Sequence, residues 1–199
     1  MYALVTDGTI TKYFNNPKGF TLGDLQYPKD IFMKWSVEEK EAIGIYEVVF
    51  DNTNLKDEQW YINTNQSFAF ANDTVTASYG SATAKAHADA NATDADGADL
   101  DPVVVIEGLK TTLIRTVKAQ AAGILANTDW YITRNAEKST AIPSAITTHR
   151  DLVRSRQATM ETQITNASNT TALETLYNYT TDSDGVQSRP LAELPTLEI

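Results

Sequence analysis

The segment GSATAKAHADANATDADGADLDP, residues 80–102, contains almost no large apolar side chain and therefore limits how this chain can fold. A segment of this composition cannot bury enough apolar surface to form a core of its own. The charge balance also changes across it: residues 1–105 contain 7 Lys or Arg and 16 Asp or Glu, whereas residues 106–199 contain 9 and 10. We therefore predict two modules, residues 1–80 and 103–180, joined by an Ala/Asp-rich linker or arm over residues 81–102.

The overall charge and hydropathy exclude several classes of protein. A net charge of −10 disfavours a general nucleic-acid binder, which usually presents a basic face. No apolar run has the length of a bilayer span, and the start MYALVTDGTI lacks the regions of a signal peptide. The absence of cysteine excludes a disulfide framework and thiolate metal sites, and it fits synthesis in a reducing cytoplasm. We expect neither a nucleic-acid nor a membrane partner.

Residues 1–80 have the pattern of a small, β-rich α+β domain. Asp7-Gly8 separates the apolar runs YALVT and TITKYF, and this dipeptide favours a hairpin turn. Ser36 followed by Glu39 is a capping pair for a short helix. Residues 45–50 predict a strand, and three later runs rich in β-branched and aromatic residues continue a meander: DEQWYIN, SFAFAN and TVTASYG.

Residues 103–180 have the pattern of an α-helical module, built as a helical hairpin. Apolar residues at steps of three and four lie on one face of a first helix: Ile106, Leu109, Leu113, Val117, Ala121 and Ile124. A proline suits the first turn of a later long helix, at Pro143. The same spacing marks the face of that helix: Ile142, Ile146, His149, Val153, Arg156, Met160 and Ile164.

Two shorter helices and an extended tail complete this prediction. Thr128 or Asp129 can cap a short helix between the two long ones, and Thr171 with Glu174 can cap a last one. Residues 181–199 contain two prolines and predict an extended tail. The expected fold class is α+β, with a β-rich N-terminal domain followed by the helical module.

One spacing in the Ala/Asp-rich segment imitates a calcium loop. Asp94, Asp96 and Gly97 match the middle of an EF-hand loop. Ala92 and Val103 then occupy the first and twelfth positions, where that loop needs its essential carboxylates. We therefore expect a solvated segment and no metal.

The chain contains no recognisable catalytic motif. Its two histidines, His87 and His149, are far apart in sequence, and a lone helical histidine is more often a packing residue than a base. No P-loop, dinucleotide fingerprint or nucleophile elbow is present. We expect no catalytic residue and no cofactor. Arg150, Arg154 and Arg156 are interleaved with acids, which favours a solvated helix face or a protein interface over phosphate contacts.

The stretch Thr128-Asp129-Trp130-Tyr131 has two interpretations. Trp130 and Tyr131 can pack in the core and fasten the short helix to the long one. They can also form an interface, because both side chains bury a large apolar area while keeping a polar edge. The two interpretations predict different effects of Trp130→Ala. A core residue should cost roughly 3–5 kcal/mol of stability, whereas an interface anchor should leave the fold intact and weaken partner binding by roughly 2 kcal/mol or more.

LANTDWYITRNAEKSTAIPSAITTHRDLVR resembles the helical C-terminal module of tailed-bacteriophage tail-fibre assembly proteins and related tail assembly chaperones. The matching positions are Leu125, Asp129, Trp130, Arg134, Ala136, Glu137, Ile142, Pro143, His149, Arg150 and Arg154. The start, with MYALVTDGTITKYF and WSVEEKEAIGIYEVVF, resembles the small N-terminal domain of such proteins less closely. The resemblance also covers proteins that stay in the particle.

This resemblance implies a non-enzymatic tail or tail-fibre assembly protein that binds a tail or fibre subunit through its helical module. The alternative is a structural virion component, such as a tail adaptor, fibre-base or baseplate-associated subunit. The expected location is the cytoplasm of the infected bacterium during assembly, or the virion tail for the alternative. Both are compatible with a homo-oligomer. The residues expected to form or support the partner-binding face are Trp130, Tyr131, Arg134, Arg150 and Arg154.

Overall fold

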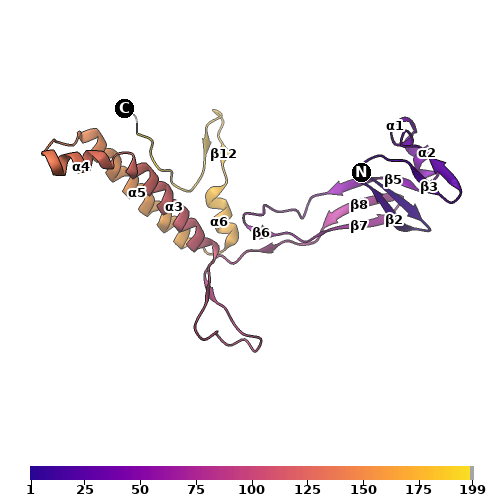
Figure 1. Cartoon of the computed structure of the whole chain (residues 1–199), viewed down its shortest axis with the longest axis horizontal. Coiled ribbons are helices and arrows are strands. Elements are labelled where there is room, and N and C mark those ends of the chain that lie inside the picture. Colours follow the sequence, from indigo (N-terminus) through magenta and orange to yellow (C-terminus); the bar gives the residue numbers. More distant parts are fainter. Residues whose placement is uncertain (198–199) are drawn as a thin grey trace. The chain divides into compact units, whose positions relative to one another are not determined.

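The computed structural model describes residues 1–197 and divides the chain into two compact units, Met1–Thr83 and Ala84–Ile199. The first unit is rich in strands and the second is mostly helical, which confirms the predicted α+β class (Figure 1). Residues 84–102 of the predicted linker or arm belong to the second unit.

The first unit is built on a five-stranded sheet of order β2-β1-β5-β8-β7. These strands are β1 (Tyr2–Thr6), β2 (Thr9–Phe14), β5 (Ile45–Asp51), β7 (Gln66–Ala71) and β8 (Thr74–Tyr79). The hairpin turn at Asp7-Gly8 is confirmed, and both residues have positive φ, 50° and 74°, as a tight hairpin turn requires. The predicted meander is wrong, because β8 lies between β5 and β7 and pairs in parallel with β5.

Apolar side chains cover both faces of this sheet. On one face, a cluster around Phe14, Phe20 and Phe32 has ring centroids 4.9 to 6.0 Å apart. Four short elements contribute to that cluster or flank it: β3 (Phe20–Leu22), β4 (Leu25–Tyr27), α1 (Ile31–Lys34) and α2 (Val37–Glu41). The predicted capping box at the start of α2 is confirmed, with Ser36 and Glu39 exchanging hydrogen bonds.

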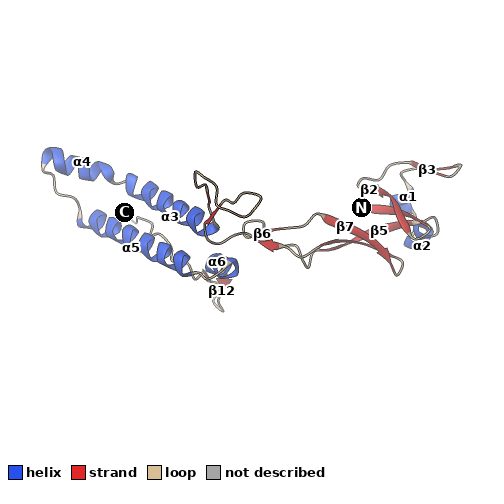
Figure 2. Ribbon diagram, turned by 90° about the horizontal axis from the view of Figure 1, so that it is seen from below, coloured by secondary structure: helices blue, strands red, loops and turns tan. Residues whose placement is uncertain are grey.

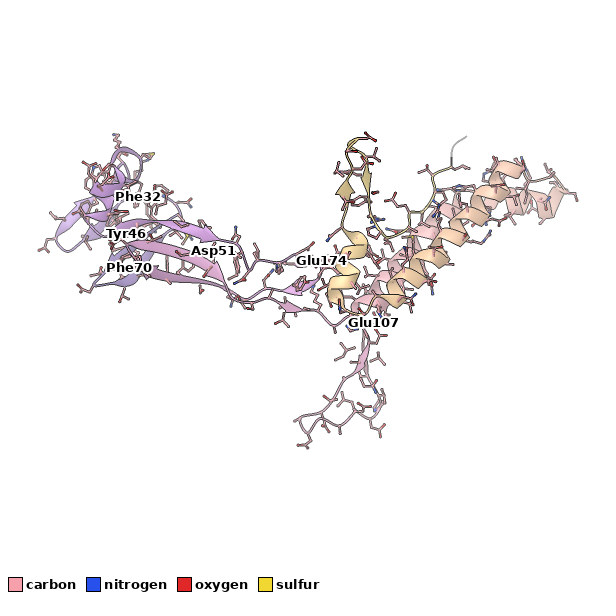
Figure 3. All side chains as sticks on the ribbon, turned by 180° about the vertical axis from the view of Figure 1, so that it is seen from behind. Phe32, Tyr46, Asp51, Phe70, Glu107 and Glu174 are labelled. Carbon is pink, nitrogen blue, oxygen red and sulfur yellow. The ribbon has the colours of Figure 1, made fainter. Side chains whose placement is uncertain are left out.

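The opposite face of the sheet is closed by curling. Its buried residues are Ala3, Val5, Val48, Val75 and Ala77. Tyr13 on β2 meets Phe68 on β7 with ring centroids 4.7 Å apart, although these strands are at opposite ends of the strand order. Tyr46 and Phe70 pack 4.8 Å apart on the same sheet (Figure 3). A two-stranded ladder of β6 (Tyr61–Ile62) and β9 (Thr83–Ala84) marks the end of this unit.

The second unit is built on a helical hairpin. Its long helices, α3 (Leu109–Ala126) and α5 (Ser144–Asn166), lie side by side, and α4 (Asp129–Lys138) follows α3 at the closed end of the hairpin (Figure 2). The seam buries Leu113, Val117, Ala121, Ile146, Val153, Met160 and Ile164, as the helical spacing predicted. Three predicted face residues are wrong. Ile106 precedes α3 in a strand, Ile142 precedes α5, and Arg156 is exposed.

The C-terminal segment folds back onto the hairpin. Helix α6 (Thr170–Tyr177) is capped by the side chain of Asn169, so the predicted cap at Thr171 is wrong. Strands β12 (Thr180–Thr181) and β13 (Gln187–Ser188) form a small hairpin within the predicted extended tail. Beyond them, Leu191 is buried, while residues 198–199 lie outside the described part of the chain.

Residues 85–89 pack against the first turn of α3, and we call them the arm base. The first turn of a helix has backbone N–H groups without partners in the helix. Here the N–H of Gly108 donates to the Asp89 carboxylate, at 2.8 Å, and the N–H of Leu109 donates to the carbonyl of Ala86, at 2.9 Å. The arm base therefore caps α3 from a distant part of the sequence.

Residues 90–107 extend from this base as a narrow hairpin, which we call the arm (Figure 1). Strands β10 (Ala90–Asn91) and β11 (Val105–Ile106) pair antiparallel near the base. At the tip, one carboxylate oxygen of Asp94 accepts hydrogen bonds from the backbone N–H groups of Asp96 and Ala98. The Asp-Gly spacing that imitates a calcium loop thus forms a tight turn.

Candidate functional site

The candidate site is a stack of three side chains on α4, namely Trp130, Tyr131 and Arg134, which we call the aromatic–arginine stack. The ring centroids of Trp130 and Tyr131 are 3.8 Å apart. The Arg134 guanidinium lies 4.7 Å from the centroid of Trp130 and 5.3 Å from that of Tyr131. Residues three and four positions apart are neighbours on a helix surface, so the helix itself brings the arginine over both rings.

The stack lies outside the core of the unit. Helix α4 contains no buried residue, and 51% of the Trp130 surface is exposed. The interpretation of Trp130 as a core residue that fastens the helices is therefore wrong. Tyr131 and Arg134 are half-buried, and the Arg134 Nε is covered without a hydrogen-bond partner. The stack offers the exposed half of Trp130 together with the Arg134 cation.

Arg150, on α5, contacts the segment from which α4 starts. Its guanidinium is buried, and only 8% of the residue is exposed. One terminal nitrogen, Nη1, lies 2.8 Å from the Leu125 carbonyl, 2.7 Å from the Thr128 hydroxyl and 2.8 Å from the Asp129 carboxylate. The cation thus meets the last turn of α3, where the helix dipole is negative, and the first residue of α4. Arg150 joins three helices at the corner that carries the stack.

Of the five residues predicted for the docking face, the structure groups three in the stack. Arg150 is not exposed, because its guanidinium is buried against the oxygens of Leu125, Thr128 and Asp129. Arg154 is exposed on α5 and pairs with Asp151 at 3.2 Å, a contact within its own helix. Arg154 therefore does not join the stack.

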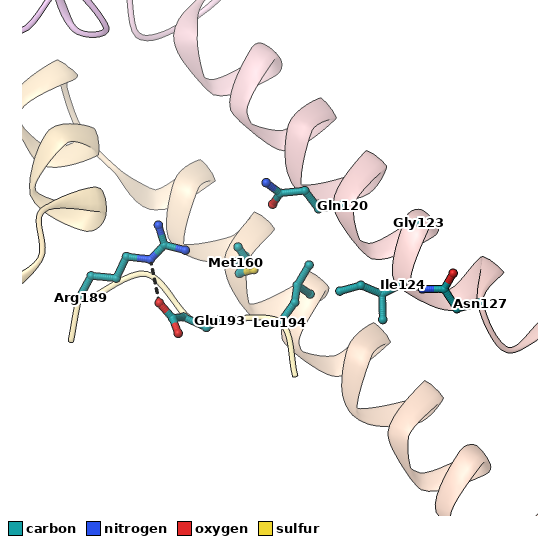
Figure 4. Close-up of a pocket in the computed structure, with 8 residues that line it drawn as sticks. All are labelled: Gln120, Gly123, Ile124, Asn127, Met160, Arg189, Glu193 and Leu194. Carbon is teal, nitrogen blue, oxygen red and sulfur yellow. Dashed lines mark ion pairs between the residues drawn. The ribbon is translucent and has the colours of Figure 1, made fainter. Parts of the chain in front are cut away.

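A pocket lies between the long helices and the C-terminal tail. Its volume is about 460 Å³, and it is lined by Gln120, Gly123, Ile124, Asn127, Met160, Arg189, Glu193 and Leu194 (Figure 4). Its two charged residues, Arg189 and Glu193, pair with each other at 3.4 Å. The Gln163 side chain holds the tail here, donating to the Pro190 carbonyl and accepting from the Ala192 N–H. The pocket is a seam beside a docked tail, with no charged group directed at a ligand.

Metal-ligating side chains do not gather in the described part of the chain. No group of three His, Cys, Asp or Glu side chains among residues 1–197 is placed to hold a metal ion. His149 is buried on α5, which agrees with a packing role. The backbone carbonyl of His87, in the arm base, accepts a hydrogen bond from the N–H of Lys110 on α3. The α4 surface can bind another molecule through aromatic stacking and through the Arg134 cation.

No protein-family model, no curated protein and no solved structure matches it. Among the described residues, no helix combines the length and hydropathy that crossing a bilayer would need.

Sequence reasoning missed the polar contacts that position the site. Thr128 was considered as a cap, but its hydroxyl donates backward to the Leu125 carbonyl, at 2.9 Å, and accepts from Arg150. The only local sign of these contacts is the pair Thr128-Asp129 directly after the first long helix, together with an arginine in the next long helix. Nothing in that spacing predicts which arginine of α5 is buried.

Proposed function

We propose that this chain is a non-enzymatic assembly protein of bacteriophage tails, which binds a tail or tail-fibre subunit through its helical unit. The observation that supports this proposal most is the exposed aromatic–arginine stack on α4. Aromatic residues and arginine are the residues most enriched at the energetic centres of protein interfaces. In this chain they stand on a helix that buries no residue of its own.

The positioning of the stack also supports a docking role. Trp130 is half exposed and stacks on Tyr131 and Arg134 of its own helix, whereas the buried Arg150 fixes the corner from which α4 starts. A preorganised surface loses less conformational entropy on binding. The stretch resembling phage tail-fibre assembly proteins includes both Trp130 and Arg150, so the resemblance and the geometry concern the same corner.

The proposal is tested by mixing the full chain with purified tail and fibre subunits of the same phage and measuring complex formation by size-exclusion chromatography. A stable complex with one subunit is the expected result. The absence of a complex with every subunit contradicts the proposal.

Mass spectrometry of purified phage particles separates an assembly chaperone from a structural component. A chaperone is expected in lysates of infected cells and absent from mature particles. A stoichiometric presence in particles means that the chain is a virion subunit, and the stack is then a permanent interface.

A further inference from the structure

The arm carries an exposed apolar strand that this chain leaves open on one side. Four consecutive β-branched residues are about half exposed: Val103 at 59%, Val104 at 49%, Val105 at 54% and Ile106 at 57%. Successive side chains of a strand point to opposite faces. An unbroken apolar run therefore has the pattern of a strand buried on both faces. The described residues cover neither face fully.

The strand also has a free hydrogen-bonding edge. It pairs with β10 alone, in a sheet of two strands. The Val104 carbonyl points to the β10 side, where it accepts from the N–H of Ala92 at 2.7 Å. Because neighbouring residues in a strand direct their backbone groups to alternate sides, those of Val105 face the open edge. An added strand that continues past the two residues of β11 would also reach Val103. Such an edge is a template for another strand, and no lysine or proline within β11 blocks it.

The charge of the arm decides what kind of strand can pair there. Residues 90–107 contain Asp94, Asp96, Asp99, Asp101 and Glu107, and no Lys or Arg. Glu107 pairs with Arg115 beside the arm base, whereas the four aspartates make no ion pair within residues 1–197. Pairing two copies of the arm would bring eight like charges together, twice these four. Self-association through this edge is therefore disfavoured, and a basic partner is favoured.

We propose that the open edge of β11 is a strand-addition site for a partner protein that supplies an apolar, lysine- or arginine-rich β-strand. The partner strand pairs with the backbone of Val103 and Val105, while its basic residues lie near the aspartates of the arm. This site is separate from the stack on α4, and it does not depend on the tail-assembly function proposed above.

The test uses the full chain and a short blocked peptide that alternates lysine and valine, labelled for fluorescence anisotropy. The peptide is expected to bind, and its glutamate–valine counterpart is not. Hydrogen exchange at the Val103 and Val105 amides is expected to slow when the lysine peptide is added. Trp130→Ala is expected to leave this binding unchanged, so its outcome is separate from that of the tail-subunit test.

Val105→Pro removes a backbone donor on the open edge, and it is expected to weaken peptide binding by about tenfold. Val105→Thr keeps the donor and the β-branched shape, so it serves as the matched control. Asp96→Asn combined with Asp101→Asn is expected to weaken binding and reduce its salt dependence, because the change removes two negative charges from the arm. These two positions are chosen because the hydrogen bonds at the tip use the side chains of Asp94 and Asp99 instead.

Three results overturn the proposal. The first is no binding of the lysine peptide to the wild-type chain, together with unchanged exchange at the two amides. The second is equal binding of the glutamate peptide. The third is a wild-type dimer in sedimentation velocity that Val105→Pro dissociates, because the occupant of the edge is then a second copy of this chain.

Discussion

The two units of this chain hold their parts together by different kinds of contact. In the first unit, apolar clusters cover both faces of a curled sheet, and Lys40 is its one buried polar residue among residues 1–83. In the second unit, apolar residues form the single seam of a hairpin, and the described residues include four buried polar ones: Thr128, His149, Arg150 and Thr170.

These polar residues stand where separate pieces attach to the hairpin. Arg150 holds the start of α4, and the Thr170 hydroxyl donates to the Lys85 carbonyl of the arm base at 2.6 Å. A piece attached at one end by hydrogen bonds keeps the rest of its surface exposed. The difference between the units supports the proposal that the second unit presents surfaces for partners.

The largest expected effect concerns the core of the first unit. Phe14→Ala deletes a fully buried ring from the aromatic cluster and is expected to cost about 3–5 kcal/mol of unfolding free energy. Native-state hydrogen exchange should show this loss in the sheet and no change in α3 and α5. An equal loss of protection in both units would mean that they unfold as one, and the comparison would fail.

The next effect concerns the polar corner of the second unit. Arg150→Ala leaves the Leu125 carbonyl and the Thr128 hydroxyl without their charged donor and is expected to destabilise the unit by about 1.5–3 kcal/mol. Urea unfolding followed by helical circular dichroism measures this change. Arg154→Ala is the matched control, with an expected cost below about 1 kcal/mol, because Arg154 is exposed. Equal effects of the two changes would show that Arg150 is not a structural joint.

The spacing of apolar residues in the sequence predicted most of the structure that apolar contacts hold together. The spacing of Leu113, Val117 and Ala121 identified the seam face of α3, and Asp7-Gly8 identified the first hairpin. The predictions depended on local signals, in which each residue's neighbours in sequence are also its neighbours in space.

The errors came from contacts between distant residues. Ile106 continues the helical period of α3, but the helix starts only at Leu109, where residues of the arm base provide the capping acceptors. Arg150 and Arg154 have similar sequence surroundings, and only the position of the α3–α4 corner decides which one is buried. The parallel pairing of β5 with β8 also depends on a long connection with no local sign.

A smaller effect is expected where the arm base meets α3. A methyl group at Gly108 would lie 2.4 Å from the backbone carbon and oxygen of Ala88, so Gly108→Ala must displace the arm base. We expect Gly108→Ala to lower the free energy of unfolding by roughly 1–3 kcal/mol, measured by differential scanning calorimetry of wild type and variant under the same conditions. Gly123→Ala in the same helix is the control. Its added methyl group meets no atom within 4 Å, and it should stabilise the helix by roughly 0.5–1 kcal/mol.

The smallest stability effect is a pH dependence of the same contact. Hydrogen bonds from the Gly108 N–H and the Thr111 hydroxyl lower the pKa of Asp89 below its ordinary value of 3.8. A lowered pKa stabilises the folded state above that ordinary value, and this contribution is lost as the pH falls through the lowered pKa. Protection factors at the first turn of α3, which are corrected for the intrinsic pH dependence of amide exchange, should therefore fall below about pH 4 in the wild type.

Asp89→Asn is the control for this titration, because the amide keeps an acceptor oxygen without an ionisable proton. The variant should lose most of the acid-dependent change at the start of α3. An identical acid response in wild type and variant would show that Asp89 does not cause the change at the start of α3.

The central claim is that the stack on α4 serves binding rather than folding, and Trp130→Ala tests it most directly when unfolding and binding of the tail subunit are measured on the same preparation. We predict an unfolding free energy within about 1 kcal/mol of wild type, because Trp130 is half exposed on a helix without buried residues. We also predict that subunit binding weakens by about 2 kcal/mol or more, roughly 30-fold. A loss of about 3–5 kcal/mol in stability with unchanged binding would contradict the claim.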